Sequence, residues 1–156
     1  MNKFKKYLSE QDELSKKGTY VAVKFTEKTN NELAEFARQL GLPDGRPYHC
    51  TVAYSRVFFE YPKLQGIKIE IAKIKQYRQF GERGEALVLE LDCPFLEILH
   101  EKIMKDNPQA TYDFETYVPH VTLSYDFESY EIPNRIPHFE LEIESIYSEE
   151  LKELEE

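Results

Sequence analysis

The sequence predicts a duplicated α+β domain, in which two mainly antiparallel sheets, related by a pseudo-twofold axis, surround a central groove and carry helices outside. Three observations support this. A chain of 156 residues, 41% of them hydrophobic and 13% aromatic, is suited to one compact domain spanning residues 1–156. The string His-x-Thr-x-x-Tyr occurs twice, beginning at His49 and at His120. The order strand, helix, motif strand, strand is also read twice, in halves of about residues 19–80 and 84–147.

A helix precedes the first half, which consists of a strand, a second helix, the motif strand and a further strand. Apolar and polar side chains alternate in the first strand, which is the period of a half-buried strand. Thr29 followed by Glu32 forms a capping box at the start of a helix that ends at Gly41. The expected elements are a helix at residues 3–17, a strand at 19–26, a helix at 29–41, a strand at 48–55 with the first motif, and an alternating strand from Ile67 that leads into an aromatic and basic stretch ending at Phe80.

The second half repeats this order. Alternate leucines mark one face of the strand that follows Gly84, and Pro94 is a favourable first residue for the next helix. The histidines of the two motifs are 71 residues apart. The expected elements are a strand at residues 85–92, a helix that Pro94 opens and that carries Phe95, Leu96, Leu99 and Ile103, a strand at 120–126 with the second motif, and a strand at 138–147.

Composition excludes several classes of function. A net charge of −9 opposes binding to long DNA or RNA, which gains affinity mainly when Lys and Arg displace counterions, but it allows a small phosphate ligand in a cleft. No apolar run is long enough to cross a bilayer or to act as a signal peptide, so we expect a cytoplasmic protein that binds no membrane. Cys50 and Cys93 lie among apolar residues and are interpreted as core residues without a redox or metal role.

The repeated motif contains the residues with the most informative chemistry. Because successive side chains of a strand point to opposite faces, the His and Thr of each motif share one face and the Tyr lies on the other. The Tyr faces are otherwise apolar, so we interpret Tyr54 and Tyr125 as packing residues of the core. The His faces are small or hydroxylic and leave room for a ligand. The candidate catalytic residues are His49, Thr51, His120 and Thr122.

Two imidazoles on opposite sides of a phosphodiester can divide the proton transfers of its cleavage, one as general base and the other as general acid. The hydroxyl groups of the two threonines would donate hydrogen bonds to the non-bridging oxygens. This chemistry needs no metal ion or other cofactor, and the sequence leaves open which histidine is the base. His100 and His138 do not complete a zinc-ligand pattern and are interpreted as structural or surface residues.

Over essentially its whole length, the chain resembles the two-histidine (2H) phosphoesterase superfamily, whose members carry a pair of His-x-Thr or His-x-Ser strands in a duplicated fold and act without metal. More narrowly, it is similar to the phage anti-CBASS nucleases, which degrade the cyclic di- and trinucleotides that trigger abortive defence in infected bacteria. The segments that carry the narrower similarity are Gly18-Thr19-Tyr20-Val21, His49-Cys50-Thr51-Val52-Ala53-Tyr54-Ser55, Pro119-His120-Val121-Thr122-Leu123-Ser124-Tyr125-Asp126 and Tyr147-Ser148-Glu149-Glu150-Leu151.

The resemblance also implies residues that contact the ligand, each with a solvent-facing or packing role as the alternative. Tyr20 would be one of them, and alternation independently places it on the groove face beside Lys24. The basic stretch at residues 63–83 either lines the mouth of the groove or forms a solvated strand face. A base-stacking aromatic residue is Trp in some relatives; this chain has no Trp, and the candidates for that role are Phe80 and Tyr77. The candidates for an acidic residue near the C-terminus are Glu149 and Glu144.

The resemblance therefore implies a metal-independent phosphodiesterase that hydrolyses 3′,5′ bonds of cyclic di- and trinucleotides in the host cytoplasm, so that a phage evades CBASS defence. Two alternatives stay open. One is a 2H enzyme that acts on 2′,3′-cyclic phosphates or RNA ends, and the other is a non-catalytic module that sequesters cyclic nucleotides. The expected partner is thus a cyclic di- or trinucleotide, and a monomer is favoured, with a dimer left open.

Overall fold

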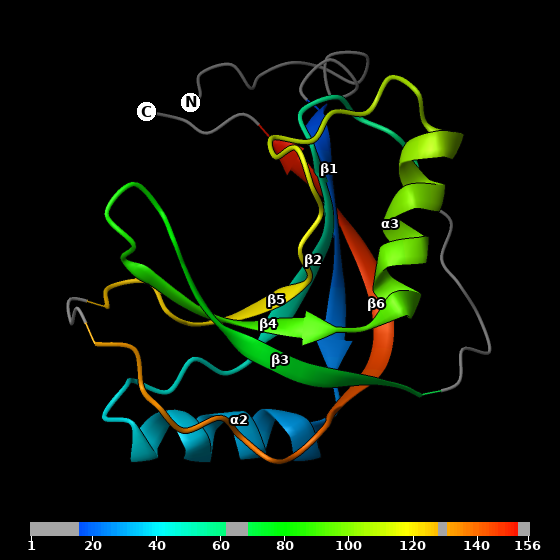
Figure 1. Cartoon of the computed structure of the whole chain (residues 1–156). Coiled ribbons are helices and arrows are strands. Elements are labelled where there is room, and N and C mark those ends of the chain that lie inside the picture. The colour runs from blue at the N-terminus through cyan, green and yellow to red at the C-terminus, as the bar shows by residue number, and fades with distance from the viewer. Residues whose placement is uncertain (1–15, 62–68, 128–130, 153–156) are drawn as a thin grey trace.

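The structure is a computed structural model that describes residues 16–61, 69–127 and 131–152. Within these ranges the chain forms six strands and two helices (Figure 1). Every paired strand is antiparallel to its neighbours, and all six belong to one sheet in the order β2-β1-β6-β3-β4-β5. In chain order the elements are β1 (Lys16–Phe25), α2 (Glu27–Gln39), β2 (His49–Ser55), β3 (Glu70–Phe80), β4 (Ala86–Asp92), α3 (Pro94–Asp106), β5 (His120–Ser124) and β6 (Leu141–Lys152).

The prediction of a duplicated fold with two sheets around a groove and helices outside is wrong. The long strand β3 is the reason, because its residues 70–72 pair with β6 whereas residues 73–80 pair with β4. Strand β3, from the first expected half, thus hydrogen-bonds to β4 and β6, both from the second, and β1 pairs with β6 as well, so the two halves share one continuous sheet. The helices do not cover two sheets either: α2 packs against β6, and α3 packs against β2, which is an end strand of the single sheet.

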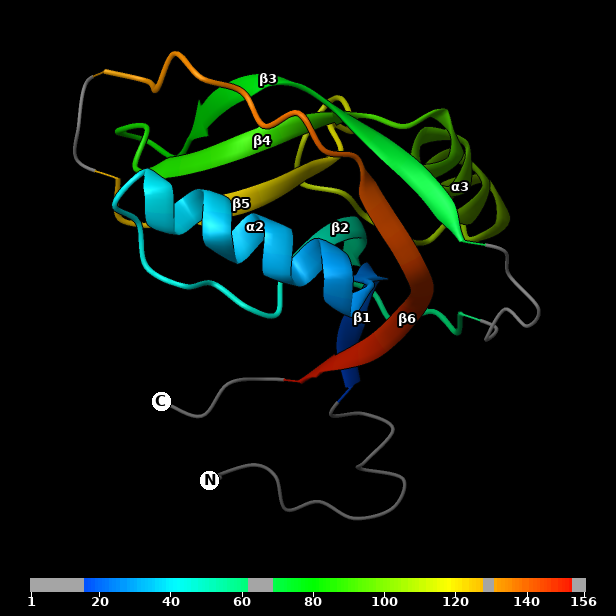
Figure 2. The same ribbon diagram turned by 90° about the horizontal axis from the view of Figure 1, so that it is seen from below.

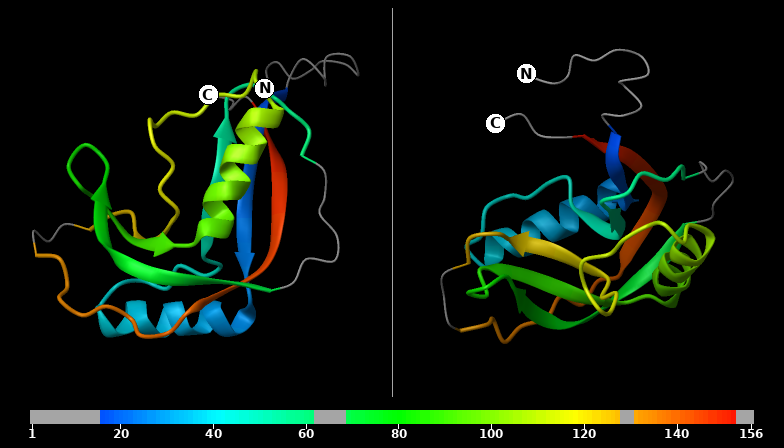
Figure 3. Two further views of the ribbon diagram at one scale, coloured as in Figure 1. Left: turned by 45° about the vertical axis from the view of Figure 1, so that its right-hand side comes forward. Right: turned by 90° about the horizontal axis from the view of Figure 1, so that it is seen from above.

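The single sheet is strongly curved. In the view of Figure 1, β1, β2 and β6 stand upright while β3 and β4 run across them, and Figure 3 shows the same two directions from another side. As a result, β2 and β5 contact each other although they are the opposite end strands of the sheet. Helix α2 lies beneath β3 and β4 in Figure 1 and in front of the sheet in Figure 2. The curvature therefore brings together the two strands that carry the repeated motif.

Helix α2 begins one turn before the expected capping box. Thr26 is its N-cap, and the Thr26 hydroxyl accepts the backbone N–H of Thr29 at 3.2 Å. Thr29 lies inside the helix, where its buried hydroxyl accepts the backbone N–H of Glu142 at 2.8 Å. The prediction that Thr29 opens the helix is wrong, since this hydroxyl joins α2 to β6 instead. The predicted end is confirmed, because Gly41 follows the helix with a φ of +79°.

The other expected elements form with shifted ends. Pro94 begins α3 as predicted. The last strand runs from Leu141 to Lys152 rather than over residues 138–147. The apolar faces of the strands and helices pack together in one core. This core contains side chains from all six strands and both helices of the described chain. Two expected segments lie outside the described residues: residues 3–15 of the expected helix, and Ile67 at the start of an expected strand. The last two residues of the expected helix, 16 and 17, begin β1 instead.

Both cysteines are buried in this core with free thiols, which confirms their interpretation as core residues. Cys50 lies on β2, and Cys93 directly precedes α3. Burial raises the pKa of the Cys50 thiol to about 12. At that pKa the thiol stays protonated near neutral pH and packs as a small apolar group. In the described ranges, no helix has the length and apolar character required to span a membrane.

Candidate active site

The two His-x-Thr motifs meet at one place in the structure. His49 begins β2 and His120 begins β5. A pocket of about 250 Å³ is lined by His49 from the first motif and by Thr122 from the second. The two strands that carry the motifs, β2 and β5, are also in direct contact. Contact between the end strands of the sheet thus joins the motifs. Loop residues that complete the pocket wall are Pro43, Asp44, Gly45, Pro47 and Tyr48.

The His120 ring is partly buried and is oriented by a hydrogen bond. Its Nδ1–H donates to the Val118 carbonyl at 2.7 Å, so that Nε2 carries the free lone pair of the neutral ring. Burial lowers the pKa of His120, and the positive charge of His49 lowers it further. Arg78 acts in the same direction, while the Glu90 carboxylate and the bond to Val118 oppose the shift. The influence of His49 means that the two imidazoles are close enough to interact electrostatically.

His49 is exposed, and its neighbours come from β1. Lys24 is its partner in the pairing of β1 with β2, which puts both side chains on one face. The Tyr20 ring meets the His49 ring edge-on, with centroids 6.3 Å apart. The Thr51 hydroxyl donates to the Tyr20 oxygen at 3.4 Å, and the Thr51 carbonyl accepts the hydroxyl of Tyr117 at 2.7 Å. Tyr20 and Lys24 therefore lie beside the first motif, and Tyr117 is a supporting residue that the sequence did not indicate.

Each motif contains a β-bulge, which reverses the expected placement of its Tyr. The register of β2 against β1 skips Val52, and the register of β5 against β4 skips Leu123. The extra residue turns the following side chains over, so that Tyr54 joins Thr51 on the same face. Tyr54 is 41% exposed and Tyr125 is 69% exposed. The interpretation of both as core residues is wrong, because strict alternation holds only where no bulge interrupts the strand.

The two candidate stacking aromatics lie on opposite faces of β3. Phe80 meets the His120 ring edge-on, with centroids 4.8 Å apart and an interplanar angle of 88°. Tyr77 is an odd number of residues away in a regular stretch of pairing, so it faces the other side. There its hydroxyl donates to the Arg135 carbonyl. The structure thus brings Phe80, and not Tyr77, to the second motif.

Of the two acidic candidates, Glu149 joins the group and Glu144 does not. Glu149 is the β6 partner of Tyr20 and is exposed on the same face of the sheet. Tyr147, two residues earlier on β6, meets the Tyr20 ring edge-on at 6.3 Å. Glu144 lies at an irregularity where the register of β6 against β1 skips one residue. Its side chain is therefore off the row that Tyr147 and Glu149 share.

A buried carboxylate, which the sequence did not indicate, lies beside His120. Glu90 is only 8% exposed and is the β4 partner of His120. Gln76 Nε2 donates to Glu90 Oε1 at 2.8 Å, and the Arg78 guanidinium lies 3.6 Å from the same oxygen. Arg78 also lies over the Phe80 ring, 5.2 Å from its centroid.

Burial raises the pKa of the Glu90 carboxyl, but the bond from Gln76 and the charges of Lys75 and Arg78 outweigh it and leave the pKa below its usual value. Glu90 is therefore ionised at neutral pH, and Lys75 and Arg78, both from the expected basic stretch, lie at the site. Alternation along β3 could have indicated the row of Gln76, Arg78 and Phe80. Nothing in the local pattern indicates Glu90, because its apolar neighbours on β4 mask it.

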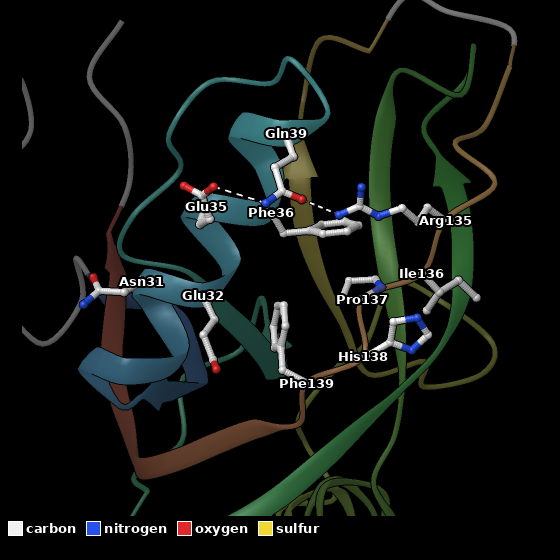
Figure 4. A pocket seen from close by; sticks show the side chains of 10 residues that line it. All are labelled: Asn31, Glu32, Glu35, Phe36, Gln39, Arg135, Ile136, Pro137, His138 and Phe139. Atoms are coloured by element: carbon white, nitrogen blue, oxygen red, sulfur yellow. Dashed lines mark hydrogen bonds between the residues drawn. The ribbon is translucent and has the colours of Figure 1, made fainter.

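The two remaining histidines lie elsewhere. His100 on α3 is buried, its Nδ1–H donates to the Val52 carbonyl at 2.7 Å, and its ring stacks on Tyr117 with centroids 4.3 Å apart. It therefore holds α3 against β2, a structural role as expected. His138 is exposed and lines a separate pocket of about 390 Å³ between α2 and residues 135–139 (Figure 4). In the part of the chain that the structure describes, no group of three His, Cys, Asp or Glu side chains is arranged to hold a metal ion.

The sequence of this chain is similar to those of one protein family. The family model described as "Anti-CBASS protein Acb1" matches residues 17–156. An anti-CBASS protein Acb1 of Acinetobacter phage Ac42 is 40% identical over 121 residues, which are 75% of this chain and 79% of that protein. The protein of the same description from Enterobacteria phage T4 is 38% identical over 70% of this chain and 72% of its own length. That of Yersinia phage phiR1-RT is 32% identical over 86% and 89%.

Proposed function

This chain belongs to the anti-CBASS protein Acb1 family, which connects it to phage evasion of CBASS, and we propose that it acts there as a phosphodiesterase that cuts 3′,5′ bonds of cyclic di- and trinucleotides. The observation that supports this most is the pocket that His49 shares with Thr122, with His120 close enough to sense the charge of His49. A site with one imidazole from each of two strands suits a reaction with two proton transfers. We also propose that the chain is a 2H phosphoesterase, because its two His-x-Thr motifs resemble those of that superfamily.

The tautomer of His120 supports its assignment as the general base. Nδ1–H is engaged by the Val118 carbonyl, so Nε2 is the atom that accepts a proton, and the lowered pKa keeps the ring neutral at physiological pH. In the proposed step, Nε2 takes the proton of the ribose 2′-hydroxyl while the 2′-oxygen attacks the phosphorus. The P–O5′ bond breaks, and protonated His49 gives its proton to the 5′-oxygen. Water then opens the resulting 2′,3′-cyclic phosphate with the two roles reversed.

The remaining side chains of the site fit the charge of this reaction. The hydroxyls of Thr51 and Thr122 would donate hydrogen bonds to the non-bridging oxygens, where negative charge builds in the transition state. Lys24, on the face of His49, and Arg78, beside His120, would offset the charge of the phosphate. Both proton transfers are carried by side chains of this chain.

Product analysis tests the proposal. The full chain is mixed with cyclic di- and trinucleotides in the presence of EDTA, then heat-denatured, and the nucleotides are separated by chromatography. We expect linear products. Recovery of intact ligand from a tight complex would instead indicate a sequestering module. Cleavage only of a linear RNA ending in a 2′,3′-cyclic phosphate, assayed in parallel, would indicate the alternative specificity.

The pH dependence of the rate should reflect His120. As the base, His120 acts in its neutral form, so kcat/KM should rise with pH through a pKa below the ordinary 6.5. The Glu90 carboxylate raises this pKa, so Glu90→Gln should move the acidic limb of the profile to still lower pH. Glu97→Gln, which removes an exposed carboxylate on α3, is the control and should leave the limb in place. A limb that moves to higher pH in Glu90→Gln would contradict the assignment.

A further inference from the structure

The two bulges expose one tyrosine in each motif at the same offset from the histidine. Tyr54 and Tyr125 each lie five residues after the motif histidine, and each follows the residue at which the strand register skips. Bulges are frequent next to active sites, where they change the direction of a side chain. Without the bulges, alternation would bury both rings in the core. The same local distortion in two separate strands therefore has one common result, which is an aromatic ring held out toward solvent.

Both exposed rings border the group of residues around the histidines. Tyr54 is the β2 partner of Tyr20, and the two rings meet edge-on with centroids 6.0 Å apart and an interplanar angle of 71°. Tyr125 lines the same 250 Å³ pocket as His49 and Thr122. Burial raises the pKa of Tyr20 to about 12, and Tyr125 is near enough to contribute to this shift. Tyr20 thus lies close to both rings, Tyr54 from the first motif and Tyr125 from the second.

We propose that Tyr54 and Tyr125 are two base-stacking platforms, one from each motif, so that the site binds a ligand with two nucleobases beside the phosphodiester. This inference rests on the proposed function, which it deepens by naming the recognition of the bases. An exposed Tyr offers a large flat surface at a low cost in conformational entropy, because only two torsion angles are fixed. Stacking tolerates different bases, since every base has a π face. The two platforms account for recognition of cyclic dinucleotides without a base-specific hydrogen bond.

Binding measurements with altered tyrosines test the platforms. The probe is a cyclic dinucleotide of 2-aminopurine riboside and adenosine, whose fluorescence is quenched when the aminopurine stacks. Binding is measured in a His49→Ala, His120→Ala background, so that the probe is not cut. Tyr54→Ala and Tyr125→Ala should each raise Kd by roughly 10- to 100-fold and reduce the quenching. Phenylalanine at either position should keep Kd within about 2-fold, because stacking needs the ring and not the hydroxyl.

A probe that lacks one base separates stacking from a general loss of structure. With a cyclic dinucleotide in which one ribose carries no base, the loss of affinity from removing the base and the loss from one Tyr→Ala change should not add. Ile98→Ala, which truncates an exposed apolar side chain on α3, is the matched control and should bind the complete probe as the parent does. Equal losses of affinity for both probes would overturn the inference, and so would unchanged binding in both Tyr→Ala variants.

The two proposals fail in distinguishable ways. If the wild-type chain binds cyclic dinucleotides through the tyrosines but releases them intact, the phosphodiesterase is refuted and the platforms stand. If the wild-type chain cuts them while both Tyr→Ala variants bind as tightly as the parent, the platforms are refuted and the phosphodiesterase stands.

Discussion

Alanine in place of His120 should reduce the turnover of a cyclic dinucleotide by about 10²- to 10⁴-fold, because the attacking hydroxyl loses its general base. His49→Ala should cause a loss of similar size, since the leaving oxygen then departs without a proton. The measurement is the rate of linear product formation at saturating substrate. In the proposed mechanism both residues act in one step, so the double variant should be little slower than the slower single variant.

His138→Ala is the matched control for these substitutions. His138 is exposed and lines the pocket beside α2 rather than the pocket of the motifs, so this variant should keep the wild-type rate. Addition of EDTA should leave the wild-type rate unchanged, because the proposed step uses side chains alone. Near-normal rates in both His49→Ala and His120→Ala would remove the assignment of these residues as acid and base.

Gly18→Ala should strongly destabilise the fold. A Cβ atom on Gly18 would lie 1.9 Å from the carbonyl oxygen of Ser55 and 3.1 Å from the Cα of Arg56. These are backbone atoms of the strand that carries the first motif and of its continuation, and they cannot rotate away as a side chain can. The strands β1 and β2 would have to separate locally. We expect the free energy of unfolding, measured with urea, to fall by about 3 kcal/mol, the upper end of the usual cost of overpacking.

Gly41→Ala separates this clash from the general effect of replacing a glycine. Among the described residues, nothing lies within 4 Å of a Cβ on Gly41, but its φ of +79° disfavours a side chain. The expected cost is therefore about 1–2 kcal/mol, from backbone conformation alone. If Gly18→Ala costs no more than Gly41→Ala, the close approach of β1 to β2 at Gly18 is not what requires the glycine.

Local chemistry was readable from the order of the amino acids. The repeated spacing of His and Thr singled out His49 and Thr122, which lie in one pocket although they are far apart in the chain. Pro94 indicated the start of α3, because the first turn of a helix has no use for the N–H that proline lacks. The motif segments also pointed to the anti-CBASS family, which the family comparison confirms. Each of these signals depends on residues that are close neighbours in the sequence.

Pairing between distant strands was not readable in that way. A hydrophobic period reports which face of a strand is buried, but it cannot report that β3 pairs with both β6 and β4 and so makes one sheet. Likewise, Tyr54 and Tyr125 turned outward because the register skips a residue against a neighbouring strand, and Glu90 reached His120 because β4 pairs with β5. Register and strand order follow from the free energy of contacts between segments far apart in the chain, and a short stretch of sequence carries no record of its partner.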